Sequence, residues 1–468
     1  MSGKIPNPES QTREIQGIFD MTMNVSDLIP VATPIVETRY RRIRTAIPVP
    51  ESIERIERLR AVEPRSMAGM PPIIWHQAEG FLIRDPYGNQ WIDLSSGIVV
   101  ANVGHAHPRV LEAIRNQVDA KLVFSYAYPT EIRRQLLERL VALAPPGPHK
   151  AILFSSGTEA TECAMSLMRK HGLKISPAKL GILSIESAYH GRTLSAKLAG
   201  SAPELVDGLD RKSVFHIQLP LPGSAESQGF LADLASRNVK PETIAGIIFE
   251  SIPGWTTTLY PQPYMKELAE WAGRYDVLIT ADEVQSGMGR TGKMFAFEHY
   301  DIEPDLIACG KGLSSSLPVS AVIGRERVME LADPGEMSST FGGNPVCAAA
   351  ALATLDVIEQ EQLVARSALL GTELGKALGA IAEGYRPYVR SLEGRGLFYS
   401  LHLKNPCTGE VLSEQADAIA MACVRRGVML FLTGRGFIKI VPPLTIDREA
   451  LLEAVEVIGE VTGETLKS

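Results

Sequence analysis

Six short apolar segments between residues 150 and 325 alternate with stretches of helical periodicity. The segments are residues 150–154, 180–184, 245–249, 277–280, 306–308 and 320–324. Strands that are apolar almost throughout are typical of a sheet buried on both faces, and helices between them supply the crossovers that parallel strands need. The sequence therefore predicts an α/β fold with a mostly parallel sheet. Ligands bind such sheets at the carboxyl ends of the strands, so polar residues at those ends are the first candidates for a site.

The segments on either side of this region predict a second, smaller lobe. Residues 80–94 form a hairpin pattern around a Pro-Tyr-Gly-Asn turn, and an alanine-rich helix is expected from Pro345. We expect residues 1–94 to be an N-terminal segment and part of the small domain, residues 95–345 the large domain, and residues 346–468 the rest of the small domain.

Composition excludes several classes of partner. A net charge of −7 offers no basic surface for nucleic acid or an anionic membrane. No apolar run approaches the ~20 residues of a membrane span, and the amino terminus does not resemble a signal peptide. The five cysteines show neither metal-ligand spacing nor a disulfide framework. We expect a cytoplasmic protein with no metal, nucleic-acid or membrane partner.

One apolar strand stops at a lysine, Lys311, which Gly310 and Gly312 enclose. Lysine is rarely buried without a partner. Burial lowers the pKa of an amine, and a neutral amine can attack a carbonyl group and hold it as a Schiff base. A strand-end lysine can also extend to solvent, and the segment alone favours that interpretation. The motifs elsewhere in the chain, taken together, favour the Schiff-base interpretation instead.

A turn of small residues, Ser155-Ser-Gly-Thr158, follows the first strand and precedes a helical pattern. Exposed backbone N–H groups at a helix start, aided by hydroxyl groups, can bind a phosphate dianion. A simple helix cap is an equally good interpretation of this segment.

An acid, Asp282, ends another apolar strand. A carboxylate at a buried strand end needs a cationic or donor partner. A pyridinium nitrogen would supply one, and a structural ion pair is the alternative.

An aromatic residue and an imidazole, Tyr189 and His190, follow the strand at 180–184. Tyr189 could stack on a planar ligand or fill the core.

The segment Gly287–Lys293 matches GxGxxG and nearly matches a phosphate-binding loop. Both motifs require a strand, this turn and then a helix. Here Asp282 and four further residues follow the strand, Met294 stands where Ser or Thr is needed, and no strong helix follows. We therefore reject both interpretations.

A phosphate cradle, a stacking aromatic, an acid for a pyridine nitrogen and a Schiff-base lysine together form a site for pyridoxal phosphate. Their order along the chain resembles the class III (omega-type) aminotransferases over roughly residues 75 to 460. The resemblance implies fold type I of the pyridoxal-phosphate-dependent transferases, with a mostly parallel seven-stranded sheet and a smaller α+β domain. The matching motifs are Gly104-His-Ala-His-Pro108, Ser155-Ser-Gly-Thr-Glu-Ala160, Tyr189-His-Gly-Arg-Thr193, Asp282-Glu-Val-Gln-Ser-Gly-Met-Gly-Arg-Thr-Gly292, Gly310-Lys-Gly312, Ser339-Thr-Phe-Gly-Gly-Asn-Pro345 and Pro442-Pro-Leu-Thr-Ile446.

The resemblance also implies roles for residues around the cofactor ring. Lys311 would carry the cofactor and, once the substrate releases it, move the proton from the carbon that bears the amine. Asp282 would keep the pyridine nitrogen protonated, so that the ring acts as an electron sink. Tyr189 would stack on the ring, His190 would lie beside it, and Gln285 would contact its 3-hydroxyl group.

The phosphate end of the cofactor would bind between two chains. Ser156, Gly157 and Thr158 would hold the phosphate, joined by Thr340 of a second subunit. Members of this family are dimers with shared active sites, so the resemblance implies at least a homodimer and leaves a tetramer open.

Two positions depart from the family together. Many relatives have a glutamate where Trp255 stands, and that glutamate gates an arginine that binds the substrate α-carboxylate. In this chain Lys439 takes the place of the arginine. Lysine lacks the bidentate fork of arginine, and losing such a pair costs about 1–3 kcal/mol. Lys439 and Arg192 could serve an anionic group, while a solvated surface lysine is the alternative for Lys439.

Three functions remain open. The first is an aminotransferase that moves an amino group from a primary amine or ω-amino acid to a 2-oxo acid, with pyruvate as an alternative to a glutamate partner. The second is an elimination lyase that releases ammonia from an amino alcohol, with phosphorylated and phosphonylated amino alcohols as candidates and a decarboxylase or epimerase as further variants. The third is a non-catalytic scaffold that kept the fold, which the retained Lys311 and Asp282 disfavour.

Overall fold

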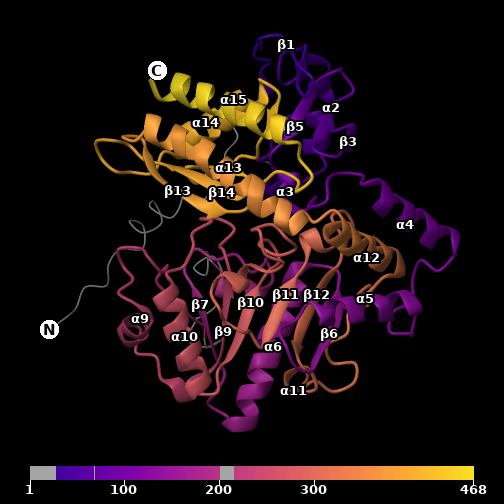
Figure 1. Ribbon diagram of the computed structural model, residues 1–468, viewed down its shortest axis with the longest axis vertical. Coiled ribbons are helices and arrows are strands. Elements are labelled where there is room, and N and C mark those ends of the chain that lie inside the picture. The colour runs from indigo at the N-terminus through magenta and orange to yellow at the C-terminus, as the bar shows by residue number, and fades with distance from the viewer. Residues whose placement is uncertain (1–27, 68, 201–215, 468) are drawn as a thin grey trace.

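A computed structural model describes residues 28–67, 69–200 and 216–467 of the chain. Figure 1 shows two lobes, one built on a large sheet and the other formed by both ends of the described part of the chain. The N-terminal segment expected over residues 1–94 begins with residues 1–27, which lie outside the described residues.

The large lobe contains a seven-stranded sheet, as expected for the family. The spatial order is β6 (His149–Phe154), β12 (Ser320–Arg325), β11 (Leu306–Cys309), β10 (Leu278–Asp282), β9 (Ile244–Glu250), β7 (Gly181–Ile185) and β8 (His216–Leu219). The strand β12 runs antiparallel to β6 and β11, and the other neighbours are parallel. Six strands coincide with the apolar segments of the sequence. The edge strand β8 was not predicted, because polar residues alternate with its two apolar ones.

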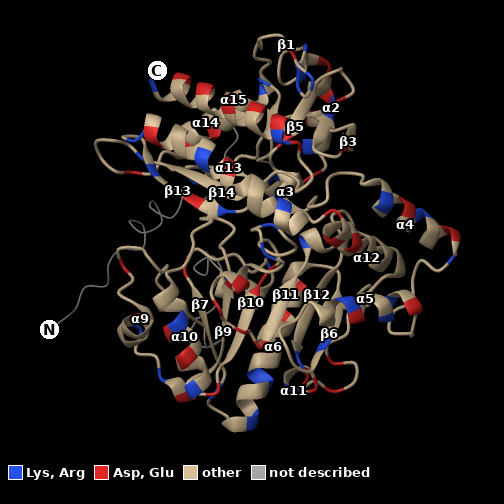
Figure 2. Cartoon of the chain, viewed as in Figure 1, with Lys and Arg blue, Asp and Glu red and all other residues tan. Residues whose placement is uncertain are grey.

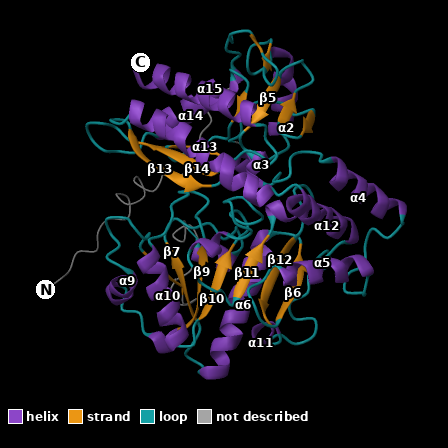
Figure 3. Ribbon diagram, in the orientation of Figure 1, coloured by secondary structure: helices purple, strands orange, loops and turns teal. Residues whose placement is uncertain are grey.

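Helices cover both faces of this sheet (Figure 3). Along β11, Leu306 and Ala308 pack against the face covered by α6 (Gly157–Ile175), and Ile307 and Cys309 belong to the core cluster on the other face. This two-residue alternation of buried side chains explains why the strand is apolar throughout. The opposite face is covered by α5 (Glu131–Ala142), α10 (Gln262–Arg274) and α12 (Pro345–Gln360).

The small lobe joins the two ends of the described chain. The predicted hairpin is present as β4 (Leu82–Arg84) and β5 (Gln90–Asp93), and the short strand β15 (Val428–Met429) pairs with β5 in parallel. Trp91 in β5 is fully buried, and its Nε1 donates to the carbonyl oxygen of Val424 at 2.7 Å. Strand pairing and burial together therefore fix the N-terminal hairpin to the C-terminal part of the chain.

A separate three-stranded antiparallel sheet faces the large lobe from the small lobe. Its strands are β13 (Val389–Arg395), β14 (Phe398–Leu403) and β16 (Phe437–Ile440), and both outer strands pair with the central strand β14. The helices packed nearby are α13 (Leu363–Gly384), α14 (Ser413–Val424) and α15 (Arg448–Lys467).

Charged residues of both signs are interspersed over the helices of the two lobes (Figure 2). Within the described residues, no helix has the length and apolarity needed to cross a bilayer. All five cysteines are free thiols.

Candidate active site

Three neighbouring parallel strands bring their carboxyl ends together. Asp282 pairs in register with Glu250 of β9 on one side and with Ala308 of β11 on the other. Lys311 follows β11 (Leu306–Cys309) after one residue, Gly310, and has a φ of 42°. A left-handed conformation in a residue other than glycine costs about 1–3 kcal/mol and is typical of functional positions. The structure thus places the predicted lysine and the predicted acid at one sheet end.

The electrostatic surroundings of Lys311 suit a nucleophilic amine. Burial lowers the pKa of Lys311, although part of the residue remains accessible, and the charges of Glu250 and Asp282 partly oppose this effect. A lowered pKa increases the fraction of neutral amine that can attack a carbonyl carbon. The lysine is therefore not a strand-end residue extended into solvent.

A histidine supports the buried acid. Asp282 is 3% exposed, and its Oδ2 lies 2.7 Å from Nδ1 of His190, while its Oδ1 accepts from the backbone N–H of Val284 at 3.0 Å. The hydroxyl group of Thr161 donates to the carbonyl oxygen of His190 at 2.7 Å and holds the histidine loop. A carboxylate has about four acceptor positions, so Asp282 can still accept from a further cationic group.

Sequence reasoning did not select Glu250, the acid beside Asp282. Its carboxylate accepts from the backbone N–H groups of Tyr189 at 2.8 Å and Gly254 at 2.9 Å. Burial and the neighbouring charge of Asp282 raise the pKa of Glu250. The available signal was an acid at the end of an apolar strand, the same signal that identified Asp282.

The small-residue turn is both a helix cap and a free anion cradle. Oε2 of Glu159 accepts from the backbone N–H groups of Ser155 at 3.1 Å and Ser156 at 2.8 Å. The next two N–H groups, of Gly157 and Thr158, have no acceptor among the described residues, as expected for the first turn of α6. The cap therefore leaves two donors for a phosphate, and the two interpretations of this segment are compatible.

Close packing joins the phosphate turn to the acid and the lysine. A Cβ atom at Gly157 would lie 2.7 Å from Cγ1 of Val284, so no larger residue fits there. A Cβ atom at Gly310 would lie 3.8 Å from Cα of Gly157. The hydroxyl group of Ser320 donates to the carbonyl oxygen of Ser156 at 2.6 Å. These residues fit pyridoxal phosphate, because a cradle for a dianion, an amine and a buried acid meet in one place.

An aromatic wall borders this sheet end. The ring of Tyr189 meets that of Trp255 edge-on, with centroids 6.0 Å apart and an interplanar angle of 87°. The exposed Arg192 lies over the Tyr189 ring at 6.0 Å. Trp255 also carries the guanidinium of Arg435, 4.2 Å from its ring centroid, a contact that the sequence did not reveal.

The second lysine, Lys439, is buried at 3% exposure and reaches the site from β16 in the small lobe. Its Nζ donates to Oε1 of Gln285 and to the carbonyl oxygen of Gly254. The ring centroid of Phe398 lies 4.7 Å from this amine. Burial and the charge of Lys311 hold the pKa of Lys439 well below its usual value. Lys439 is buried, so the alternative of a solvated surface lysine is wrong. The local sequence does not show the strand pairing that buries this residue.

Thr340 is exposed and lies in the loop before α12. The preceding residue, Ser339, donates through its hydroxyl group to Oε1 of Glu159 at 2.8 Å, which ties this loop to the phosphate turn. The following residue, Phe341, is 63% exposed and lies 5.6 Å from the ring of Phe124.

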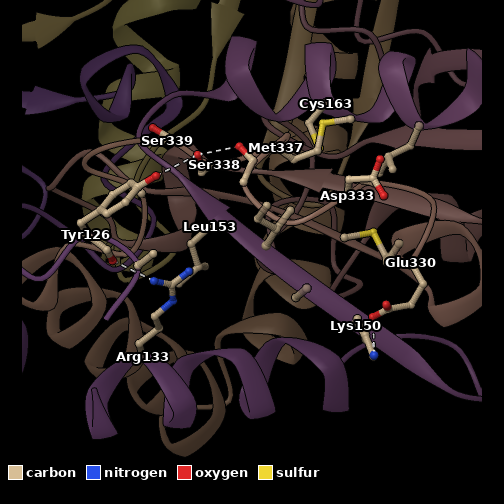
Figure 4. Close-up of a pocket in the computed structure, with 18 residues that line it drawn as sticks. Tyr126, Arg133, Lys150, Leu153, Cys163, Glu330, Asp333, Met337, Ser338 and Ser339 are labelled. Carbon is tan, nitrogen blue, oxygen red and sulfur yellow. Dashed lines mark hydrogen bonds and ion pairs between the residues drawn. The ribbon is translucent and has the colours of Figure 1, made fainter. Parts of the chain in front are cut away.

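Figure 4 shows a cavity of about 280 Å³ beside this loop, along the edge strand β6. Tyr126 and Ser338 lie at one end, where the tyrosine hydroxyl donates to the serine oxygen at 3.1 Å, and Lys150 and Glu330 lie at the other. None of the twelve residues predicted for the site lines this cavity.

The segment that resembled a nucleotide-binding loop has a structural role. After Gly292 only a short 3₁₀ helix, Ala296–His299, is formed. Arg290 is fully buried and donates to Oδ1 of Asn102 at 2.7 Å and to the carbonyl oxygens of Leu397 and Pro442. The rejection of both nucleotide-binding motifs is therefore consistent with the structure.

Comparison with known proteins agrees with this arrangement. Residues 64–462 match the family model described as aminotransferase class-III. The chain is 32% identical over 444 residues to a 4-aminobutyrate aminotransferase of Mycobacterium leprae, covering 91% of this chain and 98% of the relative. It is 34% identical over 397 residues to a mitochondrial ornithine aminotransferase of Arabidopsis thaliana, covering 83% and 81%.

A solved structure has the same fold. A transaminase from the marine bacterium Virgibacillus superposes with a TM-score of 0.80 at 26% identity, over 89% of this chain and 99% of that protein.

Proposed function

This chain belongs to the class III aminotransferases, and we propose that it moves an amino group from a primary amine or ω-amino acid to a 2-oxo acid through Lys311. Family membership implies pyridoxal phosphate and an amine or amino-acid substrate. The observation that carries the proposal is the meeting of Lys311, Asp282 and the turn at Gly157 at one sheet end. That combination supplies a nucleophile, an acid for a ring nitrogen and phosphate donors.

Each residue has a distinct task in this proposal. When bound, the pyridoxal ring supplies an electron sink for the carbon that loses a proton. The N–H groups of Gly157 and Thr158 would hold the phosphate at the start of α6, with the hydroxyl group of Ser156 beside them. Asp282, oriented by His190, would accept the hydrogen bond of the ring nitrogen. The Lys311 amine would hold the cofactor and, once released, would carry the proton to and from the substrate carbon.

The remaining contacts with the ring come from two polar or aromatic side chains. Tyr189 would stack on the ring. Gln285 would present its amide NH₂ group to the ring 3-hydroxyl, because its Oε1 already accepts from Lys439.

The surroundings of Lys439 support an amine donor without an α-carboxylate. A substrate carboxylate would have to replace the bonds from Lys439 to Gln285 and Gly254, which already satisfy the buried amine. Trp255 offers no carboxylate to exchange with it. This coordinated change also supports a 2-oxo acid other than the glutamate partner, such as pyruvate.

A second candidate is an elimination lyase acting on a phosphorylated or phosphonylated amino alcohol. The observation in its favour is that Lys439 has no carboxylate within ion-pair distance among the described residues, so no group replaces the gating glutamate. In a lyase the second half-reaction, which the missing pair would serve, is not needed.

A panel of amine donors without an acceptor separates these functions. We expect an amine to convert the yellow holoenzyme to its pyridoxamine form in one turnover, after which reaction stops until a 2-oxo acid is added. Stopped-flow absorbance and an ammonia assay measure the two events. Repeated release of ammonia without an acceptor would establish the lyase, and a colourless protein that binds no cofactor would contradict both.

We also propose that the active protein is a homodimer in which Thr340 reaches the phosphate of the partner, with a tetramer as a further possible state. In support, apolar side chains gather on the exposed surface beside Thr340. An unpaired apolar patch of this kind is typical of a subunit interface. Its members are Leu122, Val123, Phe124, Tyr126, Tyr128 and Phe341.

Mixing two inactive variants tests this sharing. We expect Lys311→Ala and Thr340→Ala chains to form hybrid dimers in which one site carries both defects and the other carries neither. Activity per hybrid should therefore reach about half that of the wild type, whereas the separate variants stay low. If Thr340 acts within its own chain, the hybrid has no intact site and its activity will not exceed the average of the two variants. Native mass spectrometry measures the hybrid fraction.

A further inference from the structure

A cavity of about 220 Å³ lies beside Trp255, whose ring also meets that of Tyr189, and both lobes line the cavity. The large lobe contributes Ser187 and Trp255 from the loops after β7 and β9. The small lobe contributes Arg390 from β13, His402 from β14 and Arg435 from the segment before β16.

The charges that line this cavity are all positive. Arginine keeps its charge at any physiological pH, and no aspartate or glutamate is among the lining residues. Within the described part of the chain, neither Arg390 nor Arg435 has a carboxylate within 4.0 Å. The charge of Arg390 has a small effect on the exposed Glu226. The pKa of Glu226 is lowered mainly by its own backbone N–H and by Ser224, and less by this arginine.

Two further side chains line the cavity, one with an unpaired N–H group and one that links the two lobes. Nε1 of Trp255 is buried and has no hydrogen-bond partner among the described residues. Nε2 of His402 lies 2.9 Å from the carbonyl oxygen of Thr256, which ties the small-lobe sheet to the Trp255 loop. The stack of Arg435 on the Trp255 ring holds one guanidinium at the wall. The cavity has an excess of donors from Arg435, from the exposed Arg390 and from Nε1 of Trp255, and it therefore suits an anion.

We propose that this cavity is a subsite for an anionic group at the end of the substrate remote from the reacting amine, a carboxylate or a phosphate or phosphonate. The inference rests on the proposed function and deepens it, because Trp255 lines the cavity and also meets the ring of Tyr189, the residue proposed to cover the cofactor ring. A tryptophan in place of an acid also removes the negative charge that would repel such a group. The substrate class is thus an amine with a distal acid.

Paired donors and arginine variants test the subsite. Donors that carry a terminal carboxylate or phosphonate are each compared with an uncharged amine of equal length in wild type, Arg435→Gln and Arg390→Gln. We expect the ratio of kcat/KM for the charged donor to that for the uncharged donor to fall about 10- to 100-fold in each variant, as for loss of a charge-assisted hydrogen bond. The two charged series show which acid the cavity accepts. The matched control is Arg386→Gln, because Arg386 is exposed and lies four residues before Arg390.

A direct binding measurement separates failure of the subsite from failure of the proposed function. Inorganic phosphate and glutarate are titrated against the cofactor-loaded protein, whose phosphate cradle is filled, and tryptophan fluorescence and melting temperature are recorded. We expect saturable changes that Arg435→Gln and Arg390→Gln weaken by about tenfold or more and Arg386→Gln leaves in place. Equal charged-to-uncharged ratios in all variants, together with binding that ignores both arginines, would overturn the subsite. If no amine reacts but arginine-dependent binding persists, the proposed function fails and the anion site stands.

Discussion

Lys311→Ala is expected to abolish transamination and the yellow colour that the cofactor gives the protein. The variant loses both the amine that holds the cofactor and the base that moves the proton at the substrate carbon. Proton transfer alone contributes about 10²–10⁴-fold to rate, and loss of the covalent link adds to this. The fold should survive, because burial opposes the charged form of this amine in the wild type and alanine removes that cost.

Borohydride reduction followed by peptide mass analysis locates the cofactor on the chain. The wild type should carry the reduced pyridoxyl group on the peptide that contains Lys311, and Lys311→Ala should carry none. The second buried lysine gives a stringent control, since Lys439→Met leaves Lys311 in place and should still be labelled. Label on Lys439 in the wild type would contradict the assignment of the nucleophile.

The sequence predicted most of the large sheet because its strands are buried on both faces and therefore apolar throughout. The strand β8 has only Ile217 and Leu219 as apolar residues and was missed, since polar residues alternate with them. Its place at the sheet edge explains the difference, because an edge strand need not be covered on both faces.

The residues of the candidate site differ in whether the local sequence was enough to predict them. Local pattern was enough for Asp282, which ends a strand, for Lys311, which comes after one, and for Gly157, which begins a helix. The surroundings of Lys439 depend on pairing between β14 and β16, which places Ser400 opposite Lys439. That pairing joins positions 39 residues apart, and the packing of Arg435 on Trp255 joins positions 180 residues apart. Sequence motifs do not record such long-range contacts.

Asp282→Asn is expected to lower kcat by about 10²- to 10⁴-fold, because a neutral amide cannot keep a pyridine nitrogen protonated. The size follows from the cost of breaking a buried charge pair, about 3–5 kcal/mol. The substitution preserves shape, and the asparagine oxygen can still accept from the backbone N–H of Val284. The loss should therefore be in chemistry rather than in folding, which thermal unfolding of the cofactor-free proteins will check.

Two companion variants show whether charge or position is responsible. His190→Asn removes the ring that lies 2.7 Å from Oδ2 of Asp282 but leaves the carboxylate, so we expect a smaller loss of about tenfold, the cost of one charge-assisted hydrogen bond. Asp305 lies at the opposite end of the sheet, where it accepts from the N–H of Ile279 at 3.0 Å, and Asp305→Asn should leave kcat within about threefold. If Asp282→Asn loses no more rate than Asp305→Asn, the carboxylate is not the partner of the ring nitrogen. Since Asp282 lies between Glu250 and the strand that leads to Lys311, the role of the whole sheet end would then need another explanation.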